Sequence, residues 1–158
     1  MKFTEFIDDL KTQGFEGFVP VYDLKKSTDV VPEKEGIYLV LRLENDEPEF
    51  LIENPGGHYN KKNPTEDIAV LRNRWIPGCH ILYVGETVDL KERITTLMKY
   101  ANGEPERHWG GRYMWQIKGS ENHLICWRLT DKHEDAKKEF IKNFKAHHNN
   151  KKPFANIK

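Results

Sequence analysis

Two short apolar runs are the clearest elements that the hydrophobic pattern of this chain predicts. They lie in residues 36–43 and 80–85, and each is rich in β-branched and aromatic residues. Polar or turn-forming residues bound both runs, which is typical of buried strands. A third run, residues 124–129, has the same character. Residues 113–117 before it alternate large side chains, so these two segments predict a hairpin.

Apolar positions at helical spacing predict three further elements. A helix is expected over residues 1–11, a second over 88–100 and a third over 134–147. The residues expected to face the core are Phe3, Phe6, Ile7 and Leu10 in the first helix, Leu90, Ile94, Leu97 and Met98 in the second, and Ala136, Phe140, Ile141 and Phe144 in the third.

The segment between the two central runs is longer than a simple connection. Residues 49–53 are expected to pair back on the first strand, and Thr65 to cap a short helix. Residues 54–64 between them are rich in Gly, Pro and Asn, and long loops are often functional. The loop could contact a substrate phosphate through His58, Tyr59, Lys61 and Lys62, or be an ordinary surface loop held by its turns.

These elements predict one α/β domain with a small central mixed or antiparallel sheet, flanked by helices. The chain has 158 residues, enough for one domain with a real core. Residues 1–35 are expected to form an N-terminal helical cap, with an extended stretch at 19–24. Residues 36–156 then form the core, with an inserted loop region at 44–80.

Composition indicates a globular, cytoplasmic protein. Hydrophobic residues make up 37% and charged residues 32%, and no apolar run approaches the length of a membrane span. The start of the chain also lacks a signal-peptide core, so no membrane association is expected. Cys79 and Cys126 do not form a metal-binding spacing, and they are predicted to be free thiols, with a disulfide as the alternative.

Charge is balanced overall but uneven along the chain. There are 25 basic and 25 acidic residues, which counts against strong non-specific binding to nucleic acid. Residues 44–53 are acidic, however, and residues 137–158 are basic. His108 and Arg112 belong to a loop dense in phosphate-contacting and stacking residues, so we expect both to bind nucleic acid. A structural role for this histidine is the alternative.

The two central strands carry the triplets Gly36-Ile37-Tyr38 and Tyr83-Val84-Gly85, and Arg93 follows on the next helix. Together with the Pro-Phe-Ala-Asn sequence that ends at Asn156, this set resembles the GIY-YIG nuclease superfamily, with valine in place of one isoleucine. The resemblance covers roughly residues 36–156. It implies an endonuclease that hydrolyses DNA phosphodiester bonds with Mg²⁺ or Mn²⁺ and without an organic cofactor.

The resemblance also implies roles for individual residues. Tyr38 would accept the proton of the attacking water, and Tyr83 would orient that water or the phosphate. Arg93 would bind the scissile phosphate, and Asn156 would position a neighbour in the site. A tyrosine with its reference pKa near ~10 is a poor base unless a cation and an arginine lower that pKa. Ordinary core aromatics are the alternative for both tyrosines.

One position departs from the pattern of the superfamily. Its metal-ligating glutamate stands three residues before a Leu-Ile pair on the last helix. Phe140-Ile141 matches that pair and puts Lys137 at the ligand position. Glu139 is the metal ligand expected here, with Glu134 as the other candidate. Alternatively, the lysine repels the cation, and the chain binds nucleic acid or a protein partner without cleavage.

Overall fold

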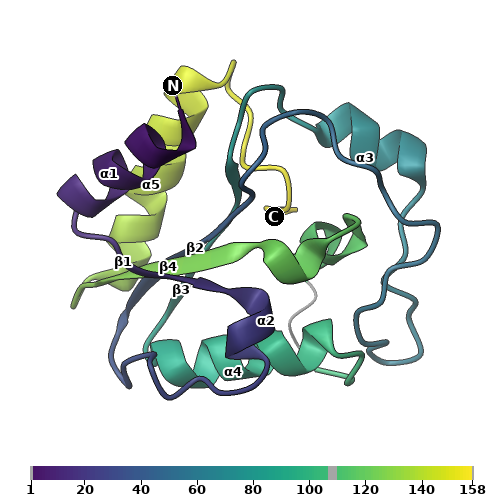
Figure 1. The fold of residues 1–158 in the computed structure, drawn as a ribbon, viewed down its shortest axis with the longest axis horizontal. Coiled ribbons are helices and arrows are strands. Elements are labelled where there is room, and N and C mark those ends of the chain that lie inside the picture. The colour runs from purple at the N-terminus through teal and green to yellow at the C-terminus, as the bar shows by residue number, and fades with distance from the viewer. Residues whose placement is uncertain (1, 107–109, 158) are drawn as a thin grey trace.

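A four-stranded antiparallel sheet lies at the centre of the molecule, with strand order β1-β4-β2-β3 (Figure 1). The computed structural model describes residues 2–106 and 110–157. The strands are β1 (Glu16–Pro20), β2 (Gly36–Leu41), β3 (Ile81–Thr87) and β4 (Leu124–Leu129). The expected α/β class is confirmed, and the sheet is antiparallel throughout its described pairings.

Helices cover both faces of the sheet (Figure 1). The long helices α1 (Phe3–Thr12) and α5 (His133–His147) lie side by side on one face. On the other face lie α2 (Val21–Leu24) and α4 (Leu90–Ala101). Helix α3 (Ile68–Arg74) lies further out, within the inserted region. The three helices expected from apolar spacing are therefore confirmed.

Burial explains why the two motif strands are continuous apolar runs. Every residue of β2 is buried, because helices cover both faces of this central strand. Its side chains alternate between two cores. Tyr38 and Val40 join the core beneath α4, whereas Ile37, Leu39 and Leu41 pack in the core under α1 and α5.

The expected strand at residues 113–117 is wrong. Residues Arg112–Gln116 instead form the 3₁₀ helix η1. Tyr113, Met114, Trp115 and Gln116 are all buried in this tight turn, and the Gln116 side chain hydrogen-bonds to the backbone of Leu51 and Glu66 in the inserted region. The hairpin with β4 is wrong for the same reason. β4 pairs with β1 and β2, and the short 3₁₀ helix η2 (Ser120–Asn122) precedes it.

Three other local expectations also need correction. Residues 49–53 do not pair with β2; Phe50 forms an isolated bridge with Ile117 instead. Helix α3 has Asp67 at its N-cap, while the Thr65 hydroxyl accepts a hydrogen bond from the backbone of Asn54, 2.9 Å away. Residues 1–35 are more than a cap, because β1 is part of the sheet. The stretch at 19–24 is extended only to Pro20 and then becomes α2.

Residues 153–156 cover the free edge of β3. The Ala155 N–H donates to the Leu82 carbonyl over 2.8 Å. The Asn156 side chain then pairs with Val84 as a strand would: its Oδ1 accepts from the Val84 N–H, and its Nδ2 donates to the Val84 carbonyl, both over 2.9 Å. Arg74 fixes this segment through its guanidinium, which donates to the carbonyls of Phe154 and Asn156. The edge strand is thus closed to further pairing.

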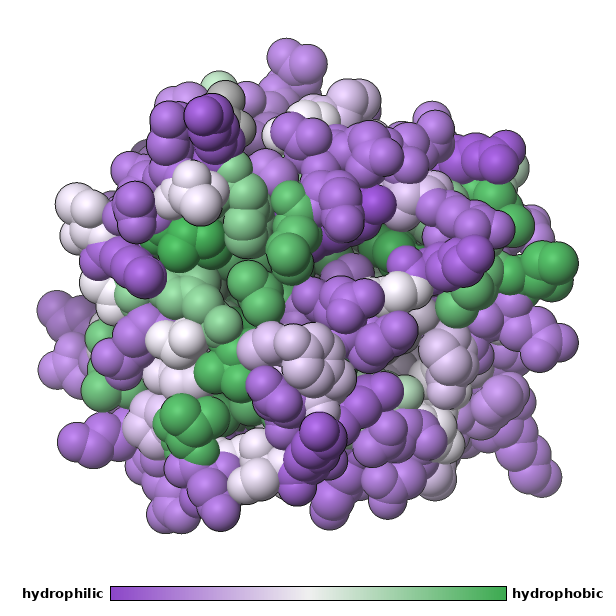
Figure 2. Space-filling model, viewed as in Figure 1, coloured by the Kyte–Doolittle hydropathy of each residue, from purple (hydrophilic) through white to green (hydrophobic). Residues whose placement is uncertain are grey.

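Most of the surface seen in Figure 2 is hydrophilic, with a smaller hydrophobic area over the part of the sheet that carries β1. Among the described residues, no helix has the length and apolar character that crossing a bilayer requires. Cys79 and Cys126 are both buried and unpaired, which confirms the expected free thiols.

His123 gives the fold a defined sensitivity to acid. Its ring is 2% exposed, and its Nε2 lies 3.0 Å from the Met114 carbonyl. Burial lowers its pKa from 6.5 to about 4. Between these values the unfolded chain binds more protons than the folded one, so stability falls as pH falls, by about 3 kcal/mol in total. We expect denaturant titrations from pH 7 to pH 4 to show a shallower loss in His123→Gln. Equal losses in the two proteins would contradict this assignment.

Candidate functional site

The two motif tyrosines lie next to each other on one face of the sheet. Tyr38 on β2 and Tyr83 on β3 have ring centroids 6.1 Å apart. Tyr38 is paired with Gly85, and a Cβ built there would meet the ring Cζ at 2.3 Å and the hydroxyl oxygen at 2.4 Å. The glycine of the second triplet therefore leaves the space that the tyrosine of the first triplet fills.

Burial governs the protonation of both tyrosines. It raises the pKa of Tyr38 well above its usual value, and the neighbouring Tyr83 raises it further. Burial also raises the pKa of Tyr83, and a hydrogen bond with Tyr38 partly opposes that rise. The charge of Arg93 lowers the pKa of both hydroxyls. Both tyrosines are therefore protonated at neutral pH in the free protein.

Arg93 connects the tyrosines to an open groove. It lies on α4 one turn after Asp89, whose side chain caps the helix by accepting from the Glu92 N–H over 3.1 Å. Arg93 lines a groove of about 550 Å³, together with Tyr59 of the inserted loop and Thr87 at the end of β3. A phosphate in this groove would meet the guanidinium that also acts on Tyr38 and Tyr83.

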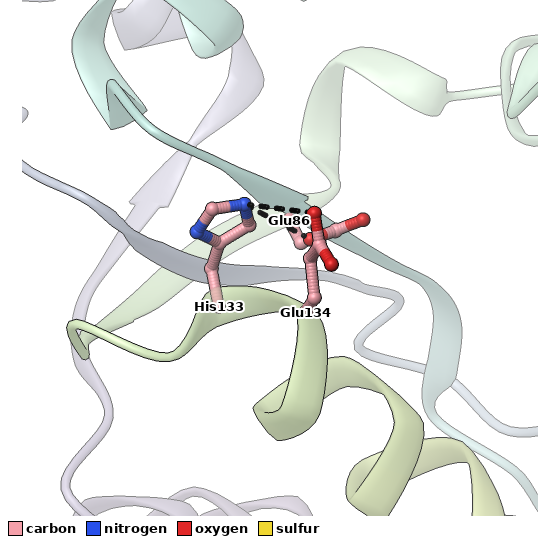
Figure 3. A group of neighbouring side chains, drawn as sticks. All are labelled: Glu86, His133 and Glu134. Atoms are coloured by element: carbon pink, nitrogen blue, oxygen red, sulfur yellow. Dashed lines mark ion pairs between the residues drawn. The ribbon is translucent and has the colours of Figure 1, made fainter.

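Three potential metal-ligating side chains gather on the opposite side of β3 (Figure 3). Glu86 comes from β3, while His133 and Glu134 come from the first turn of α5. The His133 Nε2 lies 3.4 Å from Glu86 Oε2 and 4.0 Å from Glu134 Oε1. One ligand atom from each residue lies within 4.8 Å of the others.

Glu35 contacts the His133 ring at the nitrogen that faces away from Glu86 and Glu134. Its carboxylate makes a short hydrogen bond with His133 Nδ1 and accepts from the His133 backbone N–H over 3.4 Å. This contact raises the pKa of His133 and lowers that of Glu35. The distance from Glu86 Oε2 to His133 Nε2 suits an ion pair, yet this buried oxygen makes no hydrogen bond with any described residue.

Lys137 occupies the position at which the resemblance expects a metal ligand. It lies one turn after His133 and is half-buried. Burial lowers its pKa, Glu86 opposes that shift, and Arg93 and Lys152 add to it. The Lys137 ammonium therefore lies close enough to Glu86 and Arg93 for their charges to act on it. A positively charged ammonium cannot ligate a cation, so Lys137 is not suited to be the metal ligand. The carboxylates of Glu86 and Glu134 and the imidazole of His133, which lie beside it, can ligate one.

The other predicted residues lie in different surroundings. Glu139 is exposed on α5 and is not part of the three-residue cluster. Asn156 is 3% exposed and contacts the backbone of Val84, between the tyrosine and the glycine of the second triplet. Arg112 starts η1, where its guanidinium lies 5.1 Å from the Tyr113 ring centroid. His108 lies outside the described residues.

Sequence reasoning missed Glu35, Glu86 and His133. One signal was available for Glu86, because a residue directly after Gly85 on a strand points to the face opposite Tyr38. A second signal was the His-Glu pair at the start of the predicted last helix. No spacing in the sequence links these residues, because the sheet brings Glu86 and His133 together from positions 86 and 133.

A basic surface adjoins the cluster. Lys138, Lys142 and Lys145 follow i, i+4, i+7 spacing on α5 and line one hollow together with Lys152. A neighbouring hollow contains Lys151, Lys152 and Arg74. We name the five lysines the lysine surface: Lys138, Lys142, Lys145, Lys151 and Lys152. Because the charge of Lys152 also acts on Lys137, this surface leads towards the cluster.

The assignment of this site rests on its geometry and on the resemblance of its motifs. No protein-family model matches this chain, and no curated protein or solved structure shows a significant match to it.

Proposed function

We propose that this chain is a GIY-YIG-type endonuclease that hydrolyses phosphodiester bonds in DNA with the help of a divalent cation. One observation carries the proposal: the charges of Arg93 and of Glu86, which belongs to the carboxylate–imidazole cluster on the other face of β3, both act on the paired tyrosines. Phosphodiester hydrolysis needs a bound phosphate, a positioned water and charge stabilisation, and these groups provide for all three.

Each residue of the site has a distinct task in this proposal. Arg93 binds the scissile phosphate with its planar fork and keeps a permanent positive charge beside it. Tyr83 orients the attacking water or a phosphate oxygen. Tyr38 would first lose its own proton to solvent, which the charge of Arg93 favours, and would then accept the proton of the attacking water at its phenolate oxygen. Glu86, His133 and Glu134 would hold the cation, which would supply Lewis acidity at the phosphate.

Lys137 favours a second candidate function, in which the chain binds DNA without cutting it. An ammonium near Glu86 neutralises part of the charge that would otherwise attract a cation. Lys137, Arg93 and the lysine surface would then form a continuous phosphate-binding region. The two candidates differ only in whether a cation binds and hydrolysis follows.

The proposed setting is the cytoplasm, where reducing conditions keep buried thiols such as Cys79 and Cys126 unpaired. The proposed hydrolysis uses a divalent metal ion and includes no organic cofactor.

Nicking of supercoiled plasmid tests the proposal directly. The native chain is incubated with Mg²⁺, with Mn²⁺ and with EDTA, and Arg93→Ala purified in parallel controls for contaminating nucleases. We expect nicking with a cation, none with EDTA, and little with the variant. Absence of cleavage by the native chain on plasmid, branched and single-stranded DNA would reject the nuclease and support the binding function.

The lysine surface should set the salt dependence of DNA binding. Replacing Lys138, Lys142 and Lys145 together with glutamine should weaken the salt dependence of DNA binding. The slope of the logarithm of the binding constant against the logarithm of the salt concentration should become shallower by about 2.7, because each phosphate contact contributes about 0.9. Fluorescence anisotropy with duplex DNA, without divalent cations, measures this slope. The matched control replaces three exposed lysines on other elements: Lys26, Lys99 and Lys118. An unchanged slope in the Lys138, Lys142 and Lys145 variant would show that the lysine surface does not contact DNA.

A further inference from the structure

We infer that Glu86, His133 and Glu134 form a binding site for a first-row transition-metal ion of the Mn²⁺ class rather than for Mg²⁺, with Glu35 as the residue that positions the imidazole. The inference names the cation of the proposed nuclease and rests on that function for its purpose. Binding of the ion, however, is measurable without DNA.

The distances within the cluster suit one small cation. Two ligand atoms that are each about 2.1 Å from an ion lie about 3.0 to 3.4 Å apart at octahedral or tetrahedral angles. The 3.4 Å between His133 Nε2 and Glu86 Oε2 falls at the upper end of this range. Glu134 Oε1, at 4.0 Å from Nε2, belongs to an exposed side chain that closes the remaining gap by rotation.

The supporting shell of a metal-ligating histidine is already in place. Histidine ligands usually direct their second ring nitrogen to a carboxylate, which fixes the tautomer and the orientation of the ring. Glu35 takes this position at Nδ1, and Nε2 therefore faces Glu86 and Glu134. Both Glu35 and His133 are part-buried, with side chains 33% and 18% exposed, so the ring is held rather than mobile.

A separate observation concerns the Glu86 carboxylate. Its Oε2 is inaccessible to solvent and makes no hydrogen bond with any described residue, although it lies at ion-pair distance from His133. A buried carboxylate oxygen without a hydrogen bond is costly, and a bound cation would satisfy it. The same oxygen lies 3.4 Å from His133 Nε2.

The donor chemistry selects the class of metal. Mg²⁺ is a hard cation that prefers oxygen ligands and keeps several waters, so an imidazole ligand disfavours it. Mn²⁺, Fe²⁺, Co²⁺ and Zn²⁺ accept imidazole nitrogen together with carboxylate oxygen. Two glutamates and one histidine therefore suit these ions, and Mn²⁺ is the probe because it shares carboxylate-rich sites with Mg²⁺ and is paramagnetic.

Binding of Mn²⁺ to the EDTA-treated full chain tests the inference. Calorimetry and electron paramagnetic resonance should show one bound ion, tighter than Mg²⁺, with a nitrogen coupling from the imidazole. His133→Gln should lose that coupling and bind at least about tenfold more weakly. Glu35→Gln should keep the coupling but weaken binding by about 10–100-fold, as positioning residues around metals do. Glu139→Gln on the same helix should match the native chain.

Further outcomes separate this inference from the nuclease proposal. Lys137→Met, which removes a like charge, should tighten Mn²⁺ binding by about tenfold. Melting of each variant in EDTA checks that the fold is retained. Mn²⁺ binding with nitrogen coupling but no nicking would reject the nuclease alone. Native binding without nitrogen coupling, or equal affinity in His133→Gln, would overturn the metal site even if the chain cuts DNA.

Discussion

Replacing Arg93 with alanine should lower the rate of cation-dependent nicking by about 10²–10³-fold, the usual cost of removing one charged or hydrogen-bonding group that stabilises a transition state. Arg93 lines the groove and its charge acts on both motif tyrosines. Its loss therefore removes a phosphate contact and raises the pKa of Tyr38 and Tyr83 further. Single-turnover nicking of supercoiled plasmid measures the effect.

Two matched variants show whether the effect belongs to the site. Arg93→Lys keeps a positive charge but loses the planar fork, so its rate should fall between those of the native chain and Arg93→Ala. Arg72→Ala removes an exposed arginine from α3 and should leave the rate unchanged. If Arg93→Ala nicks as fast as the native chain, the groove is not where the scissile phosphate binds.

Replacing Asn156 with alanine should destabilise the fold by about 3 kcal/mol. The variant leaves the N–H and the carbonyl of Val84 without their partners at a buried strand edge, and each orphaned group costs about 1–3 kcal/mol. In a chain of this length the melting temperature should fall by about 6–12 °C. Thermal unfolding in the absence of DNA and metal measures this loss.

Asn156→Asp distinguishes hydrogen bonding from simple loss of volume. The carboxylate still accepts from the Val84 N–H but cannot donate to the Val84 carbonyl, so it should destabilise the fold at least as much as alanine at neutral pH. Asn73→Ala, at an exposed position of α3, should be close to neutral. A fully stable Asn156→Ala with reduced nicking would instead indicate that the amide acts on the substrate.

The local hydrophobic pattern was sufficient to predict strands that pack against hydrophobic side chains on both faces. β2 is a continuous apolar run because both faces of this central strand are covered, and this signal is readable without knowledge of the tertiary structure. Residues 113–117 carried an equally strand-like pattern. Their conformation is set by tertiary contacts of Gln116, whose amide contacts the Leu51 carbonyl, the Glu66 backbone N–H and the Glu66 carbonyl. Such contacts leave no periodic trace in the sequence.

The candidate site was predictable only where residues lie close to the motif triplets. The motif spacing sets the places of three residues on β2, β3 and α4, namely Tyr38, Tyr83 and Arg93. That these three lie close together was therefore predictable from the sequence. The position of Lys137 was predictable because it stands three residues before the Phe140-Ile141 pair on α5. The cluster of Glu86, His133 and Glu134 depends on where the first turn of α5 packs against β3, and this is a property of tertiary packing.

The strand order has a consequence for synthesis on the ribosome. β4 is the last strand to be made, yet it lies between β1 and β2 and pairs with both. Until it emerges, the β1 and β2 edges that later pair with β4 are open, and the apolar β2 run is exposed to other nascent chains. The sheet therefore closes only after β4 has emerged, and His133, which follows β4, arrives later still. Cation binding at the cluster of Glu86, His133 and Glu134 would then be possible only after β4 has paired with both of its neighbours.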